Sequence, residues 1–425
     1  MFVALDGTGI NLILTGVFNQ FTFKIIHTTA FQTTTGFLAG LLRRHTPGNL
    51  QETATRKIVA YIQENIGGFD ANSLRFAVQT IKKHADENED SKQTAIDSLT
   101  LLSDLRYNTG KLKRSSLQHV IKLALDAIFD ETTMITEKSN SSFSRIDFAT
   151  RGEIRAPKKN EKILVIDAEA FEPEGDLCDA VLIVKAYQLG WKRFIVYKYR
   201  GQRFTGCGFG PATGGVRIDV YGSSGDYLAS GIDGMEIYVH GNAQDQLCQI
   251  MKDGKLVVYG DVGQTFMYGA KGGTAYIMGN AAGRPLINAV GRPRVVINGT
   301  ALDYLAESFM AGDPLNGGGF VILNGIGFND EDGSIREYDS PYPGSNIFSL
   351  ASGGAIYVRD PQKKLALEQL NGGEFNEISD ADWDLILPYL EENEKLFAIS
   401  IDRLLTVDNQ KKSPKEVYRK IMPHR

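Results

Sequence analysis

The apolar positions of the first third of the chain recur with the spacing of amphipathic helices. Residues 58–66, 74–81, 96–102 and 117–128 each place apolar side chains three and four positions apart, the period at which one face of a helix meets a core. The pair Gly67-Gly68 ends the first of these segments, as glycine commonly does after a helix. The pattern predicts a mainly helical domain within residues 1–150 and gives no indication of its role.

A different pattern follows the polar and basic stretch that runs to Lys162. Residues 162–168 (KILVIDA) and 193–199 (RFIVYKY) are typical of buried strands, and residues 176–190 between them favour a helix. We therefore expect a β-α-β unit over residues 151–205. It contains no G-x-G-x-x-G sequence, so nothing in it specifies a dinucleotide.

Residues 206–360 repeat one unit with a period near 19. Apolar β-type runs such as residues 235–241 (MEIYVHG) and 255–260 (KLVVYG) end on glycine, at intervals of 19, 19, 19, 20 and 26 residues. A fixed period of this length without helical content predicts a β-solenoid, here a right-handed parallel β-helix. Glycine is expected where a corner needs positive φ or where stacked backbones leave no room for a Cβ. The structural coil glycines are Gly222, Gly241, Gly260, Gly279, Gly299 and Gly325.

A second apolar position recurs six or seven residues after the closing glycines, at Leu228, Leu247, Phe266, Leu286 and Leu305. It predicts a second strand in each coil. The stack exposes strand edges at both ends, which must be capped. The β-α-β unit is the candidate cap at one end, and a C-terminal helical extension, residues 361–425, at the other.

The long interval near the end of the repeat contains a polar segment, residues 327–344, which should protrude as a loop. The expected fold class is therefore α+β and multidomain, with the β-helix between an N-terminal helical domain and a C-terminal helical segment.

One set of polar residues recurs at the coil corners. Asp226, Asp245 and Asp303 lie four residues after a closing glycine, and Gln264 takes the same place in another coil. Stacked carboxylates could bind a metal or act as an acid/base pair, as in polysaccharide-cleaving β-helices. Alternatively, corner Asp side chains accept hydrogen bonds from local backbone N–H groups, and the interruption by Gln264 favours that interpretation. We assign no catalytic, cofactor-binding or metal-ligating residue.

The histidine and cysteine residues of the repeat are also expected to have structural rather than catalytic roles. His240 has no second histidine at an equivalent position within two coils, so we expect it on the surface rather than in a metal site. Cys207 and Cys248 are expected to be small apolar core residues. With Cys178 they make three widely separated cysteines without a C-x-x-C pair, so zinc ribbons, iron–sulfur clusters and a disulfide framework all lack ligands.

The composition of the protein argues against nucleic acid and membranes as partners and indicates where in the cell the protein is expected. The chain has 425 residues, 42% apolar and 23% charged, with a formal charge of -5, so it gives no electrostatic footprint for nucleic acid or an anionic membrane. No stretch reaches the roughly 18 to 20 uncharged apolar residues of a membrane span, and the N-terminus lacks the basic region of a signal peptide. With its cysteine usage, the protein is expected in the cytoplasm.

The glycine-rich segment indicates a family. The sequences RGQRFTGCGFG (200–210), GNAQDQ (241–246) and MKDGKLVVYGD (251–261) resemble, in order and spacing, the GXGXG domain of the glutamate synthase large chain. The similarity covers about residues 163–360 and continues weakly to the C-terminus. A subunit similar to the C-type subunit of formylmethanofuran dehydrogenases has the same domain type. The resemblance implies a β-helix of the GXGXG type that has no catalytic residue and braces an amidotransferase domain against a flavin-binding domain.

The sequence departs from complete glutamate synthases in three ways. It has no cysteine after Met1 to act as N-terminal nucleophile, no cysteine cluster for a 3Fe–4S centre, and no room for an FMN barrel of roughly 250 residues. We therefore expect a scaffold without a cofactor, whose partners are other protein subunits such as amidotransferase, flavin or iron–sulfur oxidoreductase subunits. A scaffold in a one-carbon complex and a free-standing enzyme that uses the Asp ladder are the alternatives, and self-association stays open.

Overall fold

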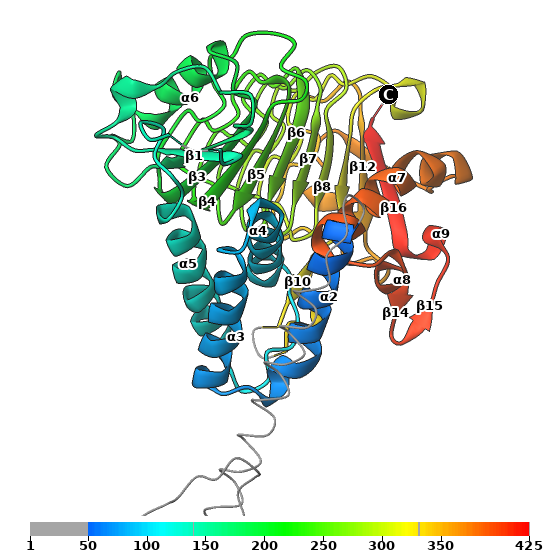
Figure 1. Ribbon diagram of the computed structural model, residues 1–425. Coiled ribbons are helices and arrows are strands. Elements are labelled where there is room, and N and C mark those ends of the chain that lie inside the picture. The colour runs from blue at the N-terminus through cyan, green and yellow to red at the C-terminus, as the bar shows by residue number, and fades with distance from the viewer. Residues whose placement is uncertain (1–49, 139, 330–331, 425) are drawn as a thin grey trace, which may run out of the picture.

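The computed structural model describes residues 50–138, 140–329 and 332–424. What the sequence suggests for residues 1–49 therefore lies outside the described part of the protein. Four helices form the N-terminal bundle (Figure 1): α2 (Leu50–Asn65), α3 (Ala71–His84), α4 (Glu89–Asp104) and α5 (Arg114–Asp130). Their apolar stripes meet in one core that contains Ile62, Leu74, Leu99 and Leu125, which is the arrangement that the helical periodicity predicts.

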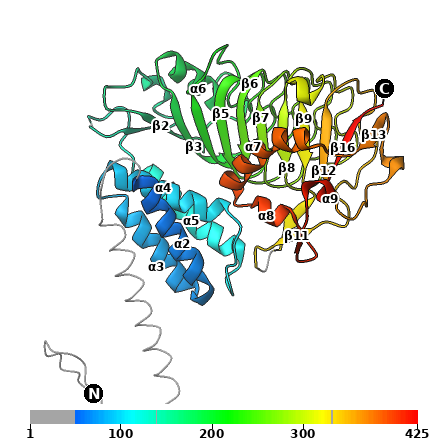
Figure 2. The same ribbon diagram turned by 90° about the vertical axis from the view of Figure 1, so that its right-hand side faces the viewer.

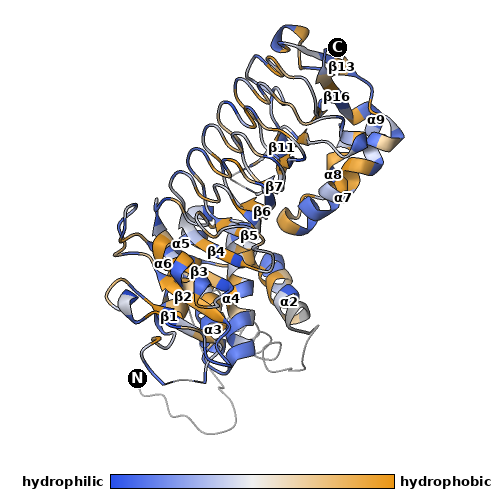
Figure 3. Cartoon of the chain, turned by 90° about the horizontal axis from the view of Figure 1, so that it is seen from above, coloured by the Kyte–Doolittle hydropathy of each residue, from blue (hydrophilic) through white to orange (hydrophobic). Residues whose placement is uncertain are grey.

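The rest of the protein is organised around one sheet of twelve strands. Ten strands are parallel, and residues at the same place in successive coils pair with each other: Leu256 lies between Ile237 and Ala275. The coils form a parallel β-solenoid of about eight turns (Figure 3), as the 19-residue period predicts. In sheet order the strands are β1 (Phe143–Ile146), β2 (Ile163–Asp167), β3 (Arg193–Arg200), β4 (Arg217–Ser223), β5 (Asp233–His240), β6 (Asp253–Val258), β7 (Thr274–Ile277), β8 (Arg294–Ile297), β9 (Phe320–Leu323), β12 (Ala355–Arg359), β16 (Tyr418–Pro423) and β13 (Gly373–Asn376).

Both faces of this sheet are buried. Inward side chains such as Ile237 and Leu256 fill the solenoid, whereas outward ones such as Val257 pack against helices, so the strands are apolar at successive positions. The N-terminal bundle covers the outer face of the first strands, with Ile195 in its core. Helices α7 (Asp380–Phe397) and α8 (Ile401–Leu404) cover the later strands (Figure 2). The two helical covers therefore meet over the middle of one sheet face.

The second apolar position of each coil does not form a strand. Residues on this side alternate the sign of φ, as at Gln246, Cys248 and Ile250, with φ of 58°, 54° and 55°. Backbone N–H groups there point alternately to neighbouring coils, since Gln246 donates to the carbonyl of Gln264 (2.8 Å) and Cys248 to that of Leu228 (2.9 Å). The recurring apolar residues, among them Leu247, are core positions on an irregular backbone, so the prediction of a second strand was wrong.

The coil glycines divide into two kinds. At Gly241, Gly279 and Gly299 an added Cβ would lie 2.6–2.9 Å from the carbonyl oxygen of the glycine one coil earlier, and Gly260 is equally close to its predecessor. Gly222 and Gly325 have positive φ, 130° and 62°, and a Cβ on Gly222 would also clash with the carbonyl oxygen of Tyr199. Close approach of stacked backbones therefore accounts for the glycines from Gly222 to Gly299, and positive φ is a further requirement at Gly222 and Gly325.

The two ends of the solenoid are closed by strands as well as helices. At the C-terminal end β16 pairs antiparallel with β12, and β13 with β16, so the segment expected to be a helical extension supplies the strands that cover the last coil. At the other end β1 pairs with β2, and the sheet therefore begins before the boundary at residue 150 that the sequence suggests. Helix α6 (Asp179–Gln188) joins β2 to β3. The smaller C-terminal elements are β14 (Thr406–Val407), β15 (Gln410–Lys411) and α9 (Pro414–Val417).

The polar insert does not simply protrude. It forms a hairpin of β10 (Ile326–Phe328) and β11 (Ile335–Glu337). Gly333, between the two strands, packs against the segment that joins α4 to α5, where a Cβ on Gly333 would lie 2.6 Å from the backbone oxygen of Tyr107. Arg403 of α8 donates to the carbonyl of Ile335 at 3.1 Å. The insert thus links the N-terminal bundle to the C-terminal segment. No helix among the described residues is long and apolar enough to cross a membrane.

Candidate functional site

The corner residues that the sequence singles out bind backbone of neighbouring coils. Asp226 Oδ1 accepts from the N–H of Asp245 (3.1 Å), and Asp245 Oδ1 accepts from the N–H of Gln264 (2.8 Å). Asp303 Oδ1 accepts from the N–H of Ser345 at 2.7 Å. These carboxylates therefore accept hydrogen bonds from backbone N–H groups of the next coil rather than from their own turn. A parallel ladder follows the closing glycines at Asn242, Asp261, Asn280 and Thr300.

The cysteines and possible metal ligands are dispersed. Cys248 and Cys178 are buried, and Cys207 is half-buried, with its thiol 3.1 Å from the carbonyl oxygen of Tyr227. Within residues 50–138, 140–329 and 332–424, no three His, Cys, Asp or Glu side chains gather as a metal ion would require.

A cavity with both polar and apolar lining lies where the two helical covers meet on the sheet. This cavity of about 930 Å³ is bounded by α2 and α4, by the outer face of β3–β5, and by the C-terminal end of α7. These elements come together in Figure 2 although they are far apart in sequence. Of the residues singled out from the sequence, only His240 lines this cavity.

His240 is buried, and its expected place on the surface was wrong. Its side chain is 7% exposed, with Nδ1 2.6 Å from Asp104 Oδ2 and Nε2 3.3 Å from Asp219 Oδ1. Burial disfavours the charged ring, but the charges and hydrogen bonds of Asp104 and Asp219 outweigh it and raise the pKa of His240 to about 9. The imidazolium therefore donates from both nitrogens. It has no lone pair with which to act as a general base at neutral pH.

Asp219 connects His240 to two arginines. Its carboxylate accepts from Nε and Nη2 of Arg217, at 3.1 and 2.8 Å, and also pairs with Arg193. Burial raises the pKa of Asp219, but Arg193, His240 and Arg217 more than offset burial and hold it below its usual range. We call these five residues, Asp104, His240, Asp219, Arg193 and Arg217, the Asp219 cluster.

An aromatic row passes through this cluster. The ring of His240 stacks between those of Tyr221 and Tyr259, at centroid separations of 4.4 and 5.4 Å. Phe129 of α5 closes one end of the row at 5.1 Å, and Phe397 of α7 closes the other at 5.3 Å. The row therefore joins the N-terminal bundle to the C-terminal helix across the sheet, and its tyrosine faces favour the cationic ring between them.

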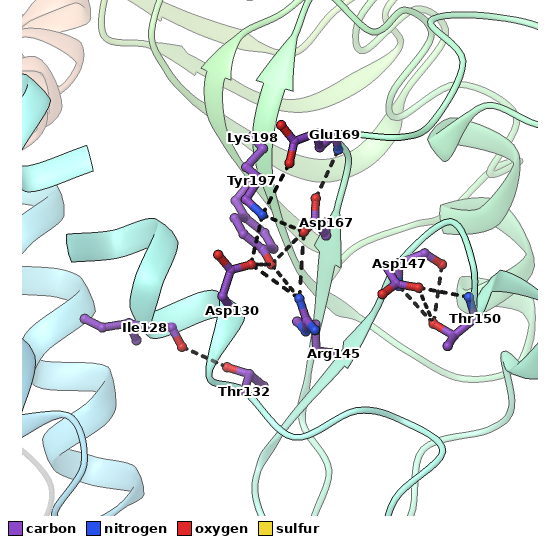
Figure 4. A network of polar contacts seen from close by, with 10 residues as sticks. All are labelled: Ile128, Asp130, Thr132, Arg145, Asp147, Thr150, Asp167, Glu169, Tyr197 and Lys198. Atoms are coloured by element: carbon purple, nitrogen blue, oxygen red, sulfur yellow. Dashed lines mark hydrogen bonds and ion pairs between the residues drawn. The ribbon is translucent and has the colours of Figure 1, made fainter. Parts of the chain in front are cut away.

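A second polar network fastens α5 to the first strands (Figure 4). Asp130, the last residue of α5, accepts from the hydroxyl of Tyr197 (2.6 Å) and from Lys198 Nζ (2.9 Å). Asp167 of β2 accepts from the same two groups, at 3.1 and 2.8 Å, and Arg145 of β1 lies 3.3 Å from Asp130. Lys198 has φ of 55° where the β3–β4 register shifts. The network thus holds α5 at a β-bulge.

The Asp219 cluster predicts a pH dependence of stability. The pKa of histidine is about 6.5 in an unfolded polypeptide and about 9 for His240 in the fold, so its stabilising contribution is complete below pH 6.5 and is lost as pH rises through 9. Relative to His240→Gln, which is neutral throughout, the wild type should lose roughly 3 kcal/mol of stability over this range. Urea unfolding of both proteins between pH 6 and about 9.5 measures the difference. A constant difference would show that His240 is not charged in the fold.

The comparisons with known proteins agree with the solenoid. The family model described as GXGXG motif matches residues 197–417, from the end of β3 through the last coil to the C-terminal segment. A search of curated proteins finds no match. The matched range is just over half of the 425 residues. It includes β13 and helices α7, α8 and α9, which the sequence resemblance reaches only weakly, and it ends before β16. The protein therefore belongs to the GXGXG motif family, which is that of the C-terminal domain of the glutamate synthase large subunit.

Proposed function

We propose that this protein is a non-catalytic scaffold subunit that holds partner proteins at a fixed separation. One observation carries the proposal: a single sheet runs from β1 to β13, and both helical covers are fastened to it by buried contacts. Buried parts of this kind do not move independently, because separating them exposes apolar surface and unpaired charges. A rigid protein of this kind is suited to holding its partners at a fixed separation.

The chemistry of the polar residues supports the same function. Asp226, Asp245 and Asp303 each use an oxygen on the backbone of the next coil, which stabilises the stack. His240 is held as an imidazolium between two carboxylates. Each of these groups has a structural partner, so the alternative of an enzyme built on the Asp ladder receives no geometric support.

Exposed apolar side chains favour the last coils as the place where a partner binds. Leu350 is 81% exposed and Leu367 is 68% exposed, and Leu302, Met310 and Leu315 of the preceding coils are also exposed. Leu350 and Leu367 are the two most exposed large apolar side chains among the described residues, and exposed apolar surface commonly marks an interface. Family membership suggests the partner class: amidotransferase, flavin or iron–sulfur oxidoreductase subunits in a cytoplasmic complex, which would supply the cofactors.

A matched pair of surface variants tests this proposal. We expect Leu350→Ser combined with Leu367→Ser to reduce the partner proteins that co-purify with the tagged full-length protein at least tenfold, because the interface core carries most binding energy. Ile250→Ser, which replaces a 44%-exposed residue earlier in the solenoid, is the control and should leave recovery unchanged. Quantitative mass spectrometry after cross-linking measures the recovery. Equal recovery of partner proteins with the wild type, the double variant and Ile250→Ser would rule out this interface.

A further inference from the structure

We propose that the cavity between α2, α4 and β3–β5 binds a small molecule that carries a phosphate or carboxylate group, with Arg193 and Arg217 as the anion-binding residues. This site is independent of the scaffold function, because it lies between the helical covers rather than on the exposed last coils. Its volume of about 930 Å³ is within the range of small-molecule sites and far larger than a lone oxyanion needs.

The two arginines are held in place and still have unused donors. Arg217 uses Nε and Nη2 on Asp219 and stacks on the ring of Tyr238, with its guanidinium carbon 3.9 Å from the ring centroid. Arg193 uses Nη1 on Asp219 and on the carbonyl of Phe194. Among the described residues, Nη1 of Arg217 and the Nε and Nη2 of Arg193 have no hydrogen-bond acceptor. Guanidinium groups fixed in this way are suited to bidentate binding of carboxylate or phosphate.

The charges around these arginines favour an anion. Asp104 is matched by the His240 imidazolium, and Asp219 pairs with both guanidinium groups. The lining as a whole still carries one positive charge in excess: five cations (Arg56, Arg193, Arg217, His240 and Lys395) stand against four carboxylates (Asp97, Asp104, Asp219 and Glu394). Glu394 accepts from the N–H of Ile401 at 3.0 Å. Asp97 accepts from Gln93 at 2.7 Å, and burial raises its pKa.

A residue of α2 that lines the cavity provides an independent observation, a buried hydroxyl group without a hydrogen-bond partner among the described residues. Thr55 lines the cavity and is 4% exposed, yet its hydroxyl Oγ1 has no hydrogen-bond partner among the described residues. An unsatisfied buried hydroxyl is costly and calls for a partner in the adjoining space. Val59, Ile96 and Leu101 add apolar lining, so the body attached to the anion is expected to be apolar or aromatic.

Calorimetric titration of the full-length protein tests the site with three probes: inorganic phosphate, phenyl phosphate and benzoate. Phenyl phosphate should bind at least threefold more tightly than inorganic phosphate, and comparison with benzoate shows whether a phosphate or a carboxylate is preferred. Arg217→Met and Arg193→Met should each weaken binding at least tenfold. Arg203→Met is the control, since this exposed arginine pairs with Glu174 and Asp226 at a coil corner, and it should bind like the wild type.

Two further variants keep the test decisive if loss of an arginine prevents folding. Thr55→Val preserves shape and removes the unpaired hydroxyl, and it should weaken binding about threefold. Ala60→Trp places a large ring on an exposed position at the α2 side of the cavity and should abolish binding without removing a charge. The proposal is overturned if none of the three probes binds saturably, or if Ala60→Trp and Thr55→Val bind the probes as the wild type does.

Discussion

Gly241→Val should unfold the solenoid or lower its stability by at least about 4 kcal/mol, whereas Asp245→Ala should cost about 1 kcal/mol. A Cβ at residue 241 would lie 2.6 Å from the carbonyl oxygen of Gly222 and 2.9 Å from its carbonyl carbon. Neither atom can move without breaking the ladder between two coils. The Asp245 change removes the bond from its Oδ1 to the N–H of Gln264 (2.8 Å) at an exposed position, where water replaces the side chain.

Thermal unfolding of the two variants beside the wild type measures this difference. Gly241→Ala should lie between them, because it adds the clashing Cβ without the branched methyl groups of valine. Similar losses for Gly241→Val and Asp245→Ala would mean that the carboxylate ladder, rather than close backbone stacking, is the main constraint on the coils.

Asp219→Asn should destabilise the protein by about 3 to 5 kcal/mol. The change keeps the shape of the side chain but leaves Arg193, Arg217 and His240 next to one another without their shared negative charge. Asp245→Asn, at an exposed corner, is the matched control and should cost less than about 1 kcal/mol because the amide keeps an acceptor oxygen.

A double variant distinguishes electrostatics from packing at Asp219. If repulsion between unpaired cations dominates, adding Arg217→Met to Asp219→Asn should recover part of the loss, so the two effects are not additive. Chemical denaturation of the four proteins gives the coupling energy. Additive losses would contradict the electrostatic explanation.

The periodic features of this fold could be predicted from sequence because each coil repeats the same local requirement. Gly241 and Gly260 mark the close approach of backbones, and apolar residues such as Leu256 mark the inward face. The strands at the C-terminal end left no such signal. β16 has two adjacent charged residues, Arg419 and Lys420, followed by Ile421 and Met422, so it neither alternates nor shares the 19-residue period. The sequence alone therefore predicts a helical extension there.

The Asp219 cluster could not be predicted in the same way. His240 and Asp104 are 136 residues apart and belong to different kinds of element, one a coil strand and the other a helix end. The position of His240 on the outward side of a strand suggests exposure unless that face is known to be covered, and the cover comes from α4 and α7. Likewise, Leu247 marks a core position, but no pattern of side chains reveals the alternating φ around it.

The central claim, that this protein works by holding other proteins, is tested most directly by native mass spectrometry of the tagged full-length protein purified from its own cells. We predict a complex whose mass is the 46.8 kDa of this polypeptide plus the mass of at least one different protein, at fixed stoichiometry. Any flavin or iron–sulfur cluster in the complex should be bound to that partner protein. Purification without a different protein, together with a stoichiometric cofactor on this polypeptide or a turnover lost on Asp303→Asn, would contradict the account.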